Sequence, residues 1–186
     1  MPESFLTPVR TLVLGGIRSG KSEWAEDAIA AALPPGQPVR YLAPGPATPD
    51  DPAWVQRVAQ HRDRRPAHWT TIETQDVAIE LGRSPETPAL VDDLGTWLTG
   101  TLDQHHAWED GSVAAPVQQI LDAVGAFAST LVLVSPEVGL TVVPATASGR
   151  RFADELGLLN RRMAGLCERV VLVVAGQPVT IKQSGL

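Results

Sequence analysis

The amino-acid sequence predicts an α/β fold in which helices cover both faces of a mostly parallel sheet. Short apolar runs, typical of buried strands, alternate along the chain with segments of helical periodicity, as they do in folds of this class. A glycine-rich loop joins the first apolar run to the first helical segment. The length of 186 residues suits a single domain, 1–186, and with 44% apolar and 19% charged residues the chain is apolar enough to bury a core.

Each element is predicted from apolar spacing and from the turn residues that bound it. Strands are expected at 11–14, 39–43, 69–73, 89–91, 131–134, 169–175 and 179–182. Helices are expected at 22–33, 52–60, 76–81, 94–102, 113–128 and 148–168. In the last helix Phe152, Leu156, Leu159 and Met163 recur at steps of three and four residues, so they share one face.

The composition argues against several classes of protein. A formal net charge of −6 and a pI near 5.1 disfavour a general nucleic-acid binder. The longest apolar runs, at 131–134 and 170–175, are much shorter than the roughly 20 residues of a membrane-spanning helix. The single cysteine, Cys167, cannot form an internal disulfide, and the first residues lack the basic and apolar regions of a signal peptide. These features predict a cytoplasmic protein with no membrane span and no nucleic-acid partner.

The loop at residues 15–22 carries the clearest functional signal. Its residues match the Walker A pattern G-x-x-x-x-G-K-[ST] and read Gly15-Gly16-Ile17-Arg18-Ser19-Gly20-Lys21-Ser22. Glycines let backbone N–H groups face phosphate oxygens, and the following helix offers its positive N-terminus to the same anion. Lys21 is expected to reach the β and γ phosphates, and the Ser22 hydroxyl to bind Mg²⁺. An ordinary glycine turn is the alternative, but the position between a strand and a helix favours this phosphate loop (residues 15–22).

Two acidic residues directly follow the predicted strand at 89–91. A Walker-type nucleotide needs a carboxylate at the tip of a neighbouring strand, to hold Mg²⁺ or its water shell. Asp92 is placed for that role, and Asp93 is the competing candidate, because strand ends read from a sequence can slip by a residue or two. Aspartate is also a preferred helix N-cap, and we assign that role to Asp93, which precedes the helix predicted at 94–102.

A histidine followed by arginines forms a second candidate. Arg62, Arg64 and Arg65 lie within four residues of His61, and the arginine fork suits phosphate oxygens. A neutral imidazole beside such a cluster could attack phosphorus. From spacing alone, however, a solvated basic end of the helix predicted at 52–60 is the favoured interpretation.

Several ordered motifs resemble the bifunctional adenosylcobinamide kinase/adenosylcobinamide-phosphate guanylyltransferases of cobalamin biosynthesis. The resemblance runs from about Thr11 to Lys182, nearly the whole chain, and includes the phosphate loop. The other matching segments are Tyr41-Leu42-Ala43, His61 to Trp69, Val91-Asp92, Trp97-Leu98, Glu137 to Leu140, Val143-Pro144, Phe152 to Asn160, Val173 to Gly176 and Ile181-Lys182. A run of motifs in this order is much more specific than a Walker A loop alone.

The resemblance implies two reactions at one nucleotide site. ATP or GTP, with Mg²⁺, would phosphorylate adenosylcobinamide, and GMP from GTP would then be transferred onto that phosphate. The residue matching the family's catalytic histidine is His61, which would carry GMP covalently. Nucleotide contacts are implied for the phosphate loop and for Ala43, Pro44, Gly45, Arg62, Asp63, Arg64, Arg65, Glu73 and Asp92. The family is further expected to have a RecA-like P-loop fold, to form homotrimers, and to need no tightly bound organic cofactor.

Three positions depart from the family's usual pattern. Pro44 replaces a threonine, Pro136 an asparagine that is often present, and Asp93 a residue that is commonly cysteine. Pro44 removes an N–H and a hydroxyl close to the expected nucleotide. Three alternatives stay open at this point: another P-loop small-molecule kinase without a covalent step, a nucleotide-binding regulatory module, and a guanylyltransferase that has lost kinase activity.

Overall fold

A computed structural model describes residues 9–45 and 65–184 of the chain, and these residues form a seven-stranded sheet and five helices. The strands are β1 (Arg10–Gly15), β2 (Arg40–Ala43), β3 (Thr70–Glu73), β4 (Ala89–Asp92), β5 (Leu131–Pro136), β6 (Arg169–Val174) and β7 (Gln177–Gln183). The helices are α1 (Lys21–Ala32), α3 (Val77–Arg83), α4 (Leu94–Gln104), α5 (Ala114–Ala126) and α6 (Ala147–Leu166). Every strand predicted from the sequence is confirmed, as are five of the six helices, with boundaries that differ by a few residues. The helix predicted at 52–60 lies outside the described residues.

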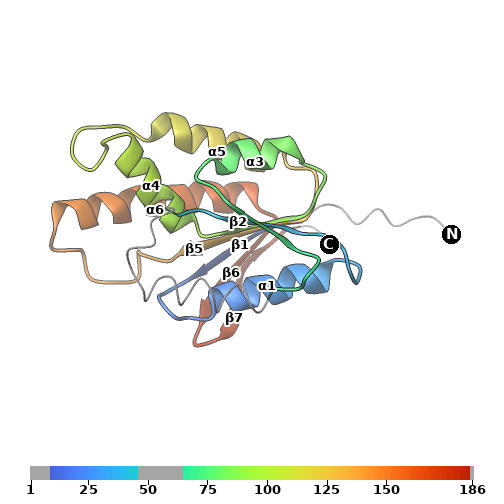
Figure 1. Cartoon of the computed structure of the whole chain (residues 1–186). Helices are drawn as coiled ribbons and strands as arrows, with labels where there is room; N and C mark the ends of the chain where they lie inside the picture. Colours follow the sequence, from blue (N-terminus) through green and yellow to red (C-terminus); the bar gives the residue numbers. More distant parts are fainter. Residues whose placement is uncertain (1–8, 46–64, 185–186) are drawn as a thin grey trace.

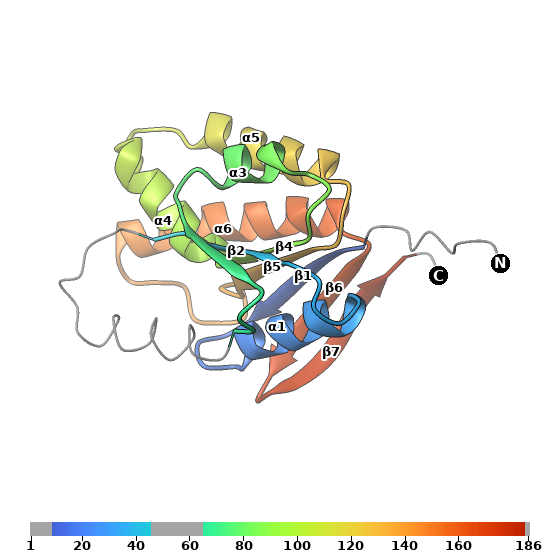
Figure 2. The same ribbon diagram turned by 45° about the vertical axis from the view of Figure 1, so that its right-hand side comes forward.

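The sheet has the order β3-β2-β4-β5-β1-β6-β7, and only β7 runs antiparallel to its neighbour. Helices cover both of its faces, as predicted: α1 lies on one face, and α3, α4, α5 and α6 lie on the other (Figure 1). The same two layers of helices are seen from a second direction in Figure 2. None of the helices in the described part of the chain is long and apolar enough to cross a membrane.

Alternation along the central strands divides the core between these two layers. In β1, Leu12 and Leu14 pack with the four-helix layer, whereas Val13 packs with Ala25 and Ile29 of α1. Successive side chains of a strand point to opposite faces, so a strand covered on both faces is apolar throughout. This is why the sequence shows unbroken apolar runs rather than alternating ones.

The carboxyl ends of the six parallel strands meet at one edge of the sheet. β5 lies between β1 and β4, with Gly15 opposite Pro136 on one side and Asp92 opposite Val134 on the other. The Glu137 N–H donates to the Gly15 carbonyl at 3.0 Å, which ties the end of β5 to the start of the phosphate loop. Ligands of open α/β sheets bind at such an edge, so the fold itself indicates where to look for the site.

The β6–β7 hairpin supports both the phosphate loop and the end of α6. Its turn residues, Ala175 and Gly176, have φ values of 51° and 76°. The Gly176 N–H donates to the Ser19 carbonyl at 2.8 Å, so the tip of the hairpin contacts the phosphate loop. At the other end of the hairpin, the Lys182 ammonium donates to the carbonyls of Ala164 and Cys167 at 2.8 and 2.7 Å. One of the chain's two lysines thus satisfies carbonyls at the C-terminus of a helix.

We predict that Lys182→Met lowers the free energy of unfolding. The methionine keeps much of the apolar stem but leaves both carbonyls without the ammonium, and hydrogen bonds to charged groups contribute roughly 1.5–3 kcal/mol. Urea denaturation measures the loss. Arg161→Met, at an exposed position of α6, is the matched control and should change stability by no more than about 0.5 kcal/mol. Equal stability of Lys182→Met and the control would contradict the capping role.

Candidate nucleotide-binding and transfer site

The phosphate loop joins β1 to α1 through a backbone that only certain residues accept. Gly20 precedes the helix with a φ of 88°, in the left-handed region that favours glycine. Gly15 is enclosed, since a Cβ there would lie 2.4 Å from Ser19 Oγ and 2.9 Å from the Val173 carbonyl oxygen. Arg18, at a φ of 57°, turns the chain at the exposed top of the loop. Two of the Walker glycines are therefore required by sterics before any ligand is considered.

Polar groups of this loop suit an anion. The N-cap residue of α1 is Gly20, which has no side chain to cap the helix, and within the described residues the buried Ser19 Oγ has no hydrogen-bond partner. Lys21 folds back over the loop, where its ammonium donates to the Gly16 carbonyl at 3.4 Å. N–H groups at a helix N-terminus, together with a lysine whose one hydrogen bond to the described residues is long, form a site that a phosphate can occupy.

Asp92 lies opposite the first turn of α1, at the end of β4. Leu90 packs against the α1 layer, and the period of two places the Asp92 side chain on the same face. There the Ser22 hydroxyl donates to Asp92 Oδ1 at 3.2 Å. A hydroxyl and a carboxylate are the hard oxygen donors that Mg²⁺ takes, and this ion usually completes its shell with water and nucleotide phosphates. One hydroxyl and one carboxylate make a donor set that fits an ion arriving with a nucleotide.

The second oxygen of Asp92 is held by Tyr41 of β2. The Tyr41 hydroxyl donates to Asp92 Oδ2 at 2.6 Å. Burial, and then the charge of Asp92, raise the pKa of Tyr41 well above its usual range, so the phenol stays protonated and remains a donor. The guanidinium of Arg65 lies over the Tyr41 ring, 3.4 Å from its centroid, and also donates to Thr71 Oγ1 of β3 at 2.9 Å. Both carboxylate oxygens of Asp92 therefore have a donor within the protein.

Asp93 has the role of helix cap that the sequence predicts. Its Oδ1 accepts from the Thr96 N–H at 2.7 Å and begins α4. Burial, followed by the neighbouring charge of Asp92, raises the pKa of Asp93 above its usual value. Pro136 packs close by, since a Cβ on Gly95 would lie 2.8 Å from Pro136 Cγ and 3.3 Å from Asp93 Oδ1. Two of the three departures from the family pattern thus adjoin one glycine at the start of α4.

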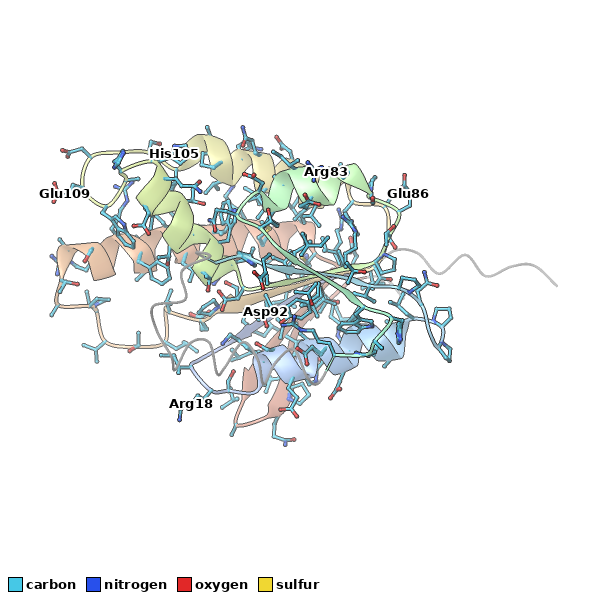
Figure 3. The ribbon with its side chains drawn as sticks, in the orientation of Figure 1. Arg18, Arg83, Glu86, Asp92, His105 and Glu109 are labelled. Atoms are coloured by element: carbon cyan, nitrogen blue, oxygen red, sulfur yellow. The ribbon has the colours of Figure 1, made fainter. Side chains whose placement is uncertain are left out.

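The remaining predicted residues divide by position. Ala43 ends β2 beside Glu73, the exposed last residue of β3, and Pro44, which is buried, and Gly45 follow at the same edge of the sheet. Within the phosphate loop, Ile17 and Arg18 are exposed, and Figure 3 shows Arg18 on the α1 side of Asp92. Arg83 and Glu86, which are not predicted site residues, lie at the opposite end of the sheet, before β4 begins. His61, Arg62, Asp63 and Arg64 lie outside the described residues.

Comparisons with known proteins agree with this architecture. The model of the family "Cobinamide kinase / cobinamide phosphate guanyltransferase" matches residues 11–181. The bifunctional adenosylcobalamin biosynthesis protein CobP of Pseudomonas aeruginosa is 40% identical over 181 residues, which cover 94% of this chain and 98% of the relative. The proteins named CobU of Salmonella typhimurium and Escherichia coli are 33% and 32% identical over 184 residues, covering 92% of this chain and 98% of each relative.

The chain belongs to the cobinamide kinase/cobinamide phosphate guanylyltransferase family. It is a transferase of cobalamin biosynthesis with a kinase and a nucleotidyltransferase reaction. The resemblance identified from the sequence motifs is thereby confirmed. Membership decides against two alternatives, a small-molecule kinase that transfers no nucleotide and a regulatory module.

One residue of this cobinamide kinase/guanylyltransferase site was missed by sequence reasoning. Tyr41 was noted only as part of a matching motif, although its hydroxyl contacts Asp92 directly. A signal was available, since this is the only tyrosine of the chain and lies in a strand predicted to be buried. A buried tyrosine hydroxyl needs a hydrogen-bond partner, but the sequence alone does not tell which residue supplies it.

For the phosphate loop of this family member we predict that Gly15→Ala destabilises the free protein and weakens GTP binding. The new methyl group would collide with Ser19 and with the backbone of β6, and overpacking of this kind costs roughly 1–3 kcal/mol. Thermal unfolding without nucleotide measures the first effect, and calorimetric titration with GTP the second.

Gly16→Ala is the matched control for stability, because a Cβ there meets nothing within 4 Å. Its free energy of unfolding should stay within about 0.5 kcal/mol of wild type. If both variants unfolded like wild type, the account of a sterically closed loop would be wrong.

Proposed function

We propose that this chain phosphorylates adenosylcobinamide with ATP or GTP and then transfers GMP from GTP to adenosylcobinamide phosphate, giving adenosylcobinamide-GDP. Both steps use the triphosphate bound at the phosphate loop. The observation that carries the proposal is the approach of Asp92 to Ser22 across the sheet, beside Lys21. It brings the Lys21 ammonium, the N-terminus of α1 and a pair of hard oxygen donors to one edge of the sheet.

In the kinase step the chain holds the nucleotide and neutralises its charge. Lys21 would bind oxygens of the β and γ phosphates, and the N–H groups of the loop would donate hydrogen bonds to the other phosphate oxygens. Ser22 and Asp92 would hold Mg²⁺, which supplies charge neutralisation between the phosphates when bound. Positioning and electrostatics suffice for transfer of the γ-phosphoryl group to the substrate hydroxyl, so no protein nucleophile is required.

In the guanylyl step we assign the nucleophile to His61. Its imidazole nitrogen attacks the α phosphorus of GTP, a P–N bond forms, and pyrophosphate leaves with the electrons of the broken P–O bond. An oxygen of the substrate's phosphate then attacks the same phosphorus, and the P–N bond breaks to release the imidazole. Arg65 supports this assignment, because it is four residues from His61, at most about 14 Å of extended chain, and is held beside Asp92 through Tyr41.

The rest of the proposal rests on the family resemblance. Arg62, Asp63, Arg64, Arg65, Glu73 and the turn Ala43-Pro44-Gly45 would contact the guanine nucleotide. The chain would act in the cytoplasm as a homotrimer of one-domain subunits, with no organic cofactor and no nucleic acid. Static light scattering measures the assembly directly, and a monomer at working concentration would contradict the trimer.

One incubation tests both activities together. Purified protein, adenosylcobinamide, GTP and Mg²⁺ should yield adenosylcobinamide phosphate and then adenosylcobinamide-GDP, identified by mass spectrometry. Supplying adenosylcobinamide phosphate in place of adenosylcobinamide separates the second step from the first. Formation of adenosylcobinamide-GDP only when the phosphate is supplied would favour the remaining alternative, a guanylyltransferase without kinase activity.

We predict that Lys21→Ala impairs both half reactions by on the order of 100-fold or more, because preorganised charges at a transferring phosphoryl group have effects of that size. A point charge beside the triphosphate serves attack at the γ and the α phosphorus alike. Rates of each half reaction, measured separately, test this. Loss of one activity with the other intact would contradict a shared phosphate site.

We predict that His61→Ala abolishes guanylyl transfer and leaves kinase activity close to that of wild type. Wild-type protein mixed with GTP and Mg²⁺ should gain the mass of one GMP, in an acid-labile and base-stable linkage. The variant should gain none. His68→Ala, at an exposed position seven residues further on, is the matched control and should keep the adduct. Peptide mapping that placed GMP on another residue would refute the assignment.

A further inference from the structure

Tyr41 reaches Asp92 from the side opposite Ser22. The two hydroxyls contact different oxygens of one carboxylate, Ser22 at Oδ1 and Tyr41 at Oδ2. The orientation of that carboxylate is thereby fixed at both ends. We propose that Tyr41 is a positioning residue for nucleotide transfer: its hydroxyl holds Asp92 Oδ2 so that Oδ1 faces Ser22 and the divalent cation that accompanies the nucleotide. This inference rests on the function proposed above.

Tyr41 is itself held rigidly enough to orient another group. Its side chain is 1% exposed, and β2 lies between β3 and β4, with Thr71 and Leu90 as the residues opposite Tyr41. The ring is covered by the Arg65 guanidinium at 3.4 Å, and Arg65 is fixed in turn by Thr71. A chain of contacts thus runs from β3 through β2 to β4, and it ends on the carboxylate beside the phosphate loop.

The same contacts connect two parts of the proposed site. Arg65 belongs to the arginine segment that follows His61, whereas Asp92 and Ser22 belong to the triphosphate site. Tyr41 contacts both sides, Asp92 with its hydroxyl and Arg65 with its ring face. Residues that orient a metal-binding carboxylate typically change metal affinity 10- to 100-fold when they are removed, although they never touch the ion.

A purely structural tyrosine would behave differently from a positioning one. If the hydrogen bond of the hydroxyl only stabilised the core, removing the hydroxyl would lower stability and leave the Mg²⁺ dependence of nucleotide binding unchanged. If it positions Asp92, its removal should change the dependence of nucleotide binding on Mg²⁺ and spare the binding that needs no Mg²⁺. Tyr41→Phe separates the two roles, because it keeps the buried ring and its contact with Arg65.

The test is a titration of Mg²⁺ with α,β-methylene GTP, an analogue that cannot transfer GMP. The Mg²⁺ concentration at half-maximal binding should rise about tenfold in Tyr41→Phe. Affinity for the analogue in EDTA should equal that of wild type. Thr101→Val removes another buried hydroxyl, one that donates within α4 to the Trp97 carbonyl, and should leave the Mg²⁺ midpoint unchanged. An unchanged midpoint in folded Tyr41→Phe would overturn the inference, as would equal loss of affinity with and without Mg²⁺.

A second measurement needs no variant, because the chain has a single tyrosine. Protein labelled with ¹³C at tyrosine Cζ should give one NMR signal, which reports the hydrogen bond of the hydroxyl. Adding Mg²⁺ to the analogue-bound protein should shift this signal, since the accepting carboxylate then faces a cation. An unchanged signal would overturn the inference.

Wild type that binds the analogue equally well in Mg²⁺ and in EDTA would reject the proposed Mg²⁺ site and this inference together. A Mg²⁺-dependent wild type beside an unaffected Tyr41→Phe would reject only the role of Tyr41.

Discussion

The hydrogen bond between Ser22 and Asp92 is the contact on which the site depends. It joins the first turn of α1 to the end of a strand that is not adjacent to β1 in the sheet. The intervening β5 sets the distance between β1 and β4, and its own end is tied to the phosphate loop by the hydrogen bond from the Glu137 N–H to the Gly15 carbonyl. Because these strands are parallel, all their carboxyl ends reach the same edge, where a triphosphate would meet a lysine, a helix N-terminus and a carboxylate.

The phosphate loop is supported from the side of β6 and β7 as well as from its own strand. Val173 closes the space beside Gly15, and Gly176 donates to the carbonyl of Ser19. A loop held in this way keeps its N–H groups oriented before the ligand arrives, which lowers the cost of reorganisation on binding. On the other side of the site, Tyr41 and Arg65 hold Asp92 and the end of the arginine segment. The candidate site is thus defined by contacts from five strands rather than by its Walker motif alone.

The sequence predicted the order and type of the described elements because strands covered on both faces give apolar runs, and α6 gives a clear helical period. It also predicted the phosphate loop and the capping role of Asp93, both of which depend on neighbours in sequence. Tyr41 was missed because its partner is 51 residues away and the pairing of β2 with β4 is a property of the sheet order. The closeness of Asp93 and Pro136 around Gly95 was likewise invisible, since 43 residues separate the two departures along the chain.

The central claim is that one phosphate loop serves both reactions. Calorimetric titration of the protein with α,β-methylene GTP in Mg²⁺, repeated in the presence of increasing ATP, tests it most directly. We expect one analogue molecule per chain and an apparent affinity that falls in proportion to the ATP concentration, as for two ligands competing for one site. Two nucleotides bound per chain, or an affinity for the analogue that ATP leaves unchanged, would contradict the account.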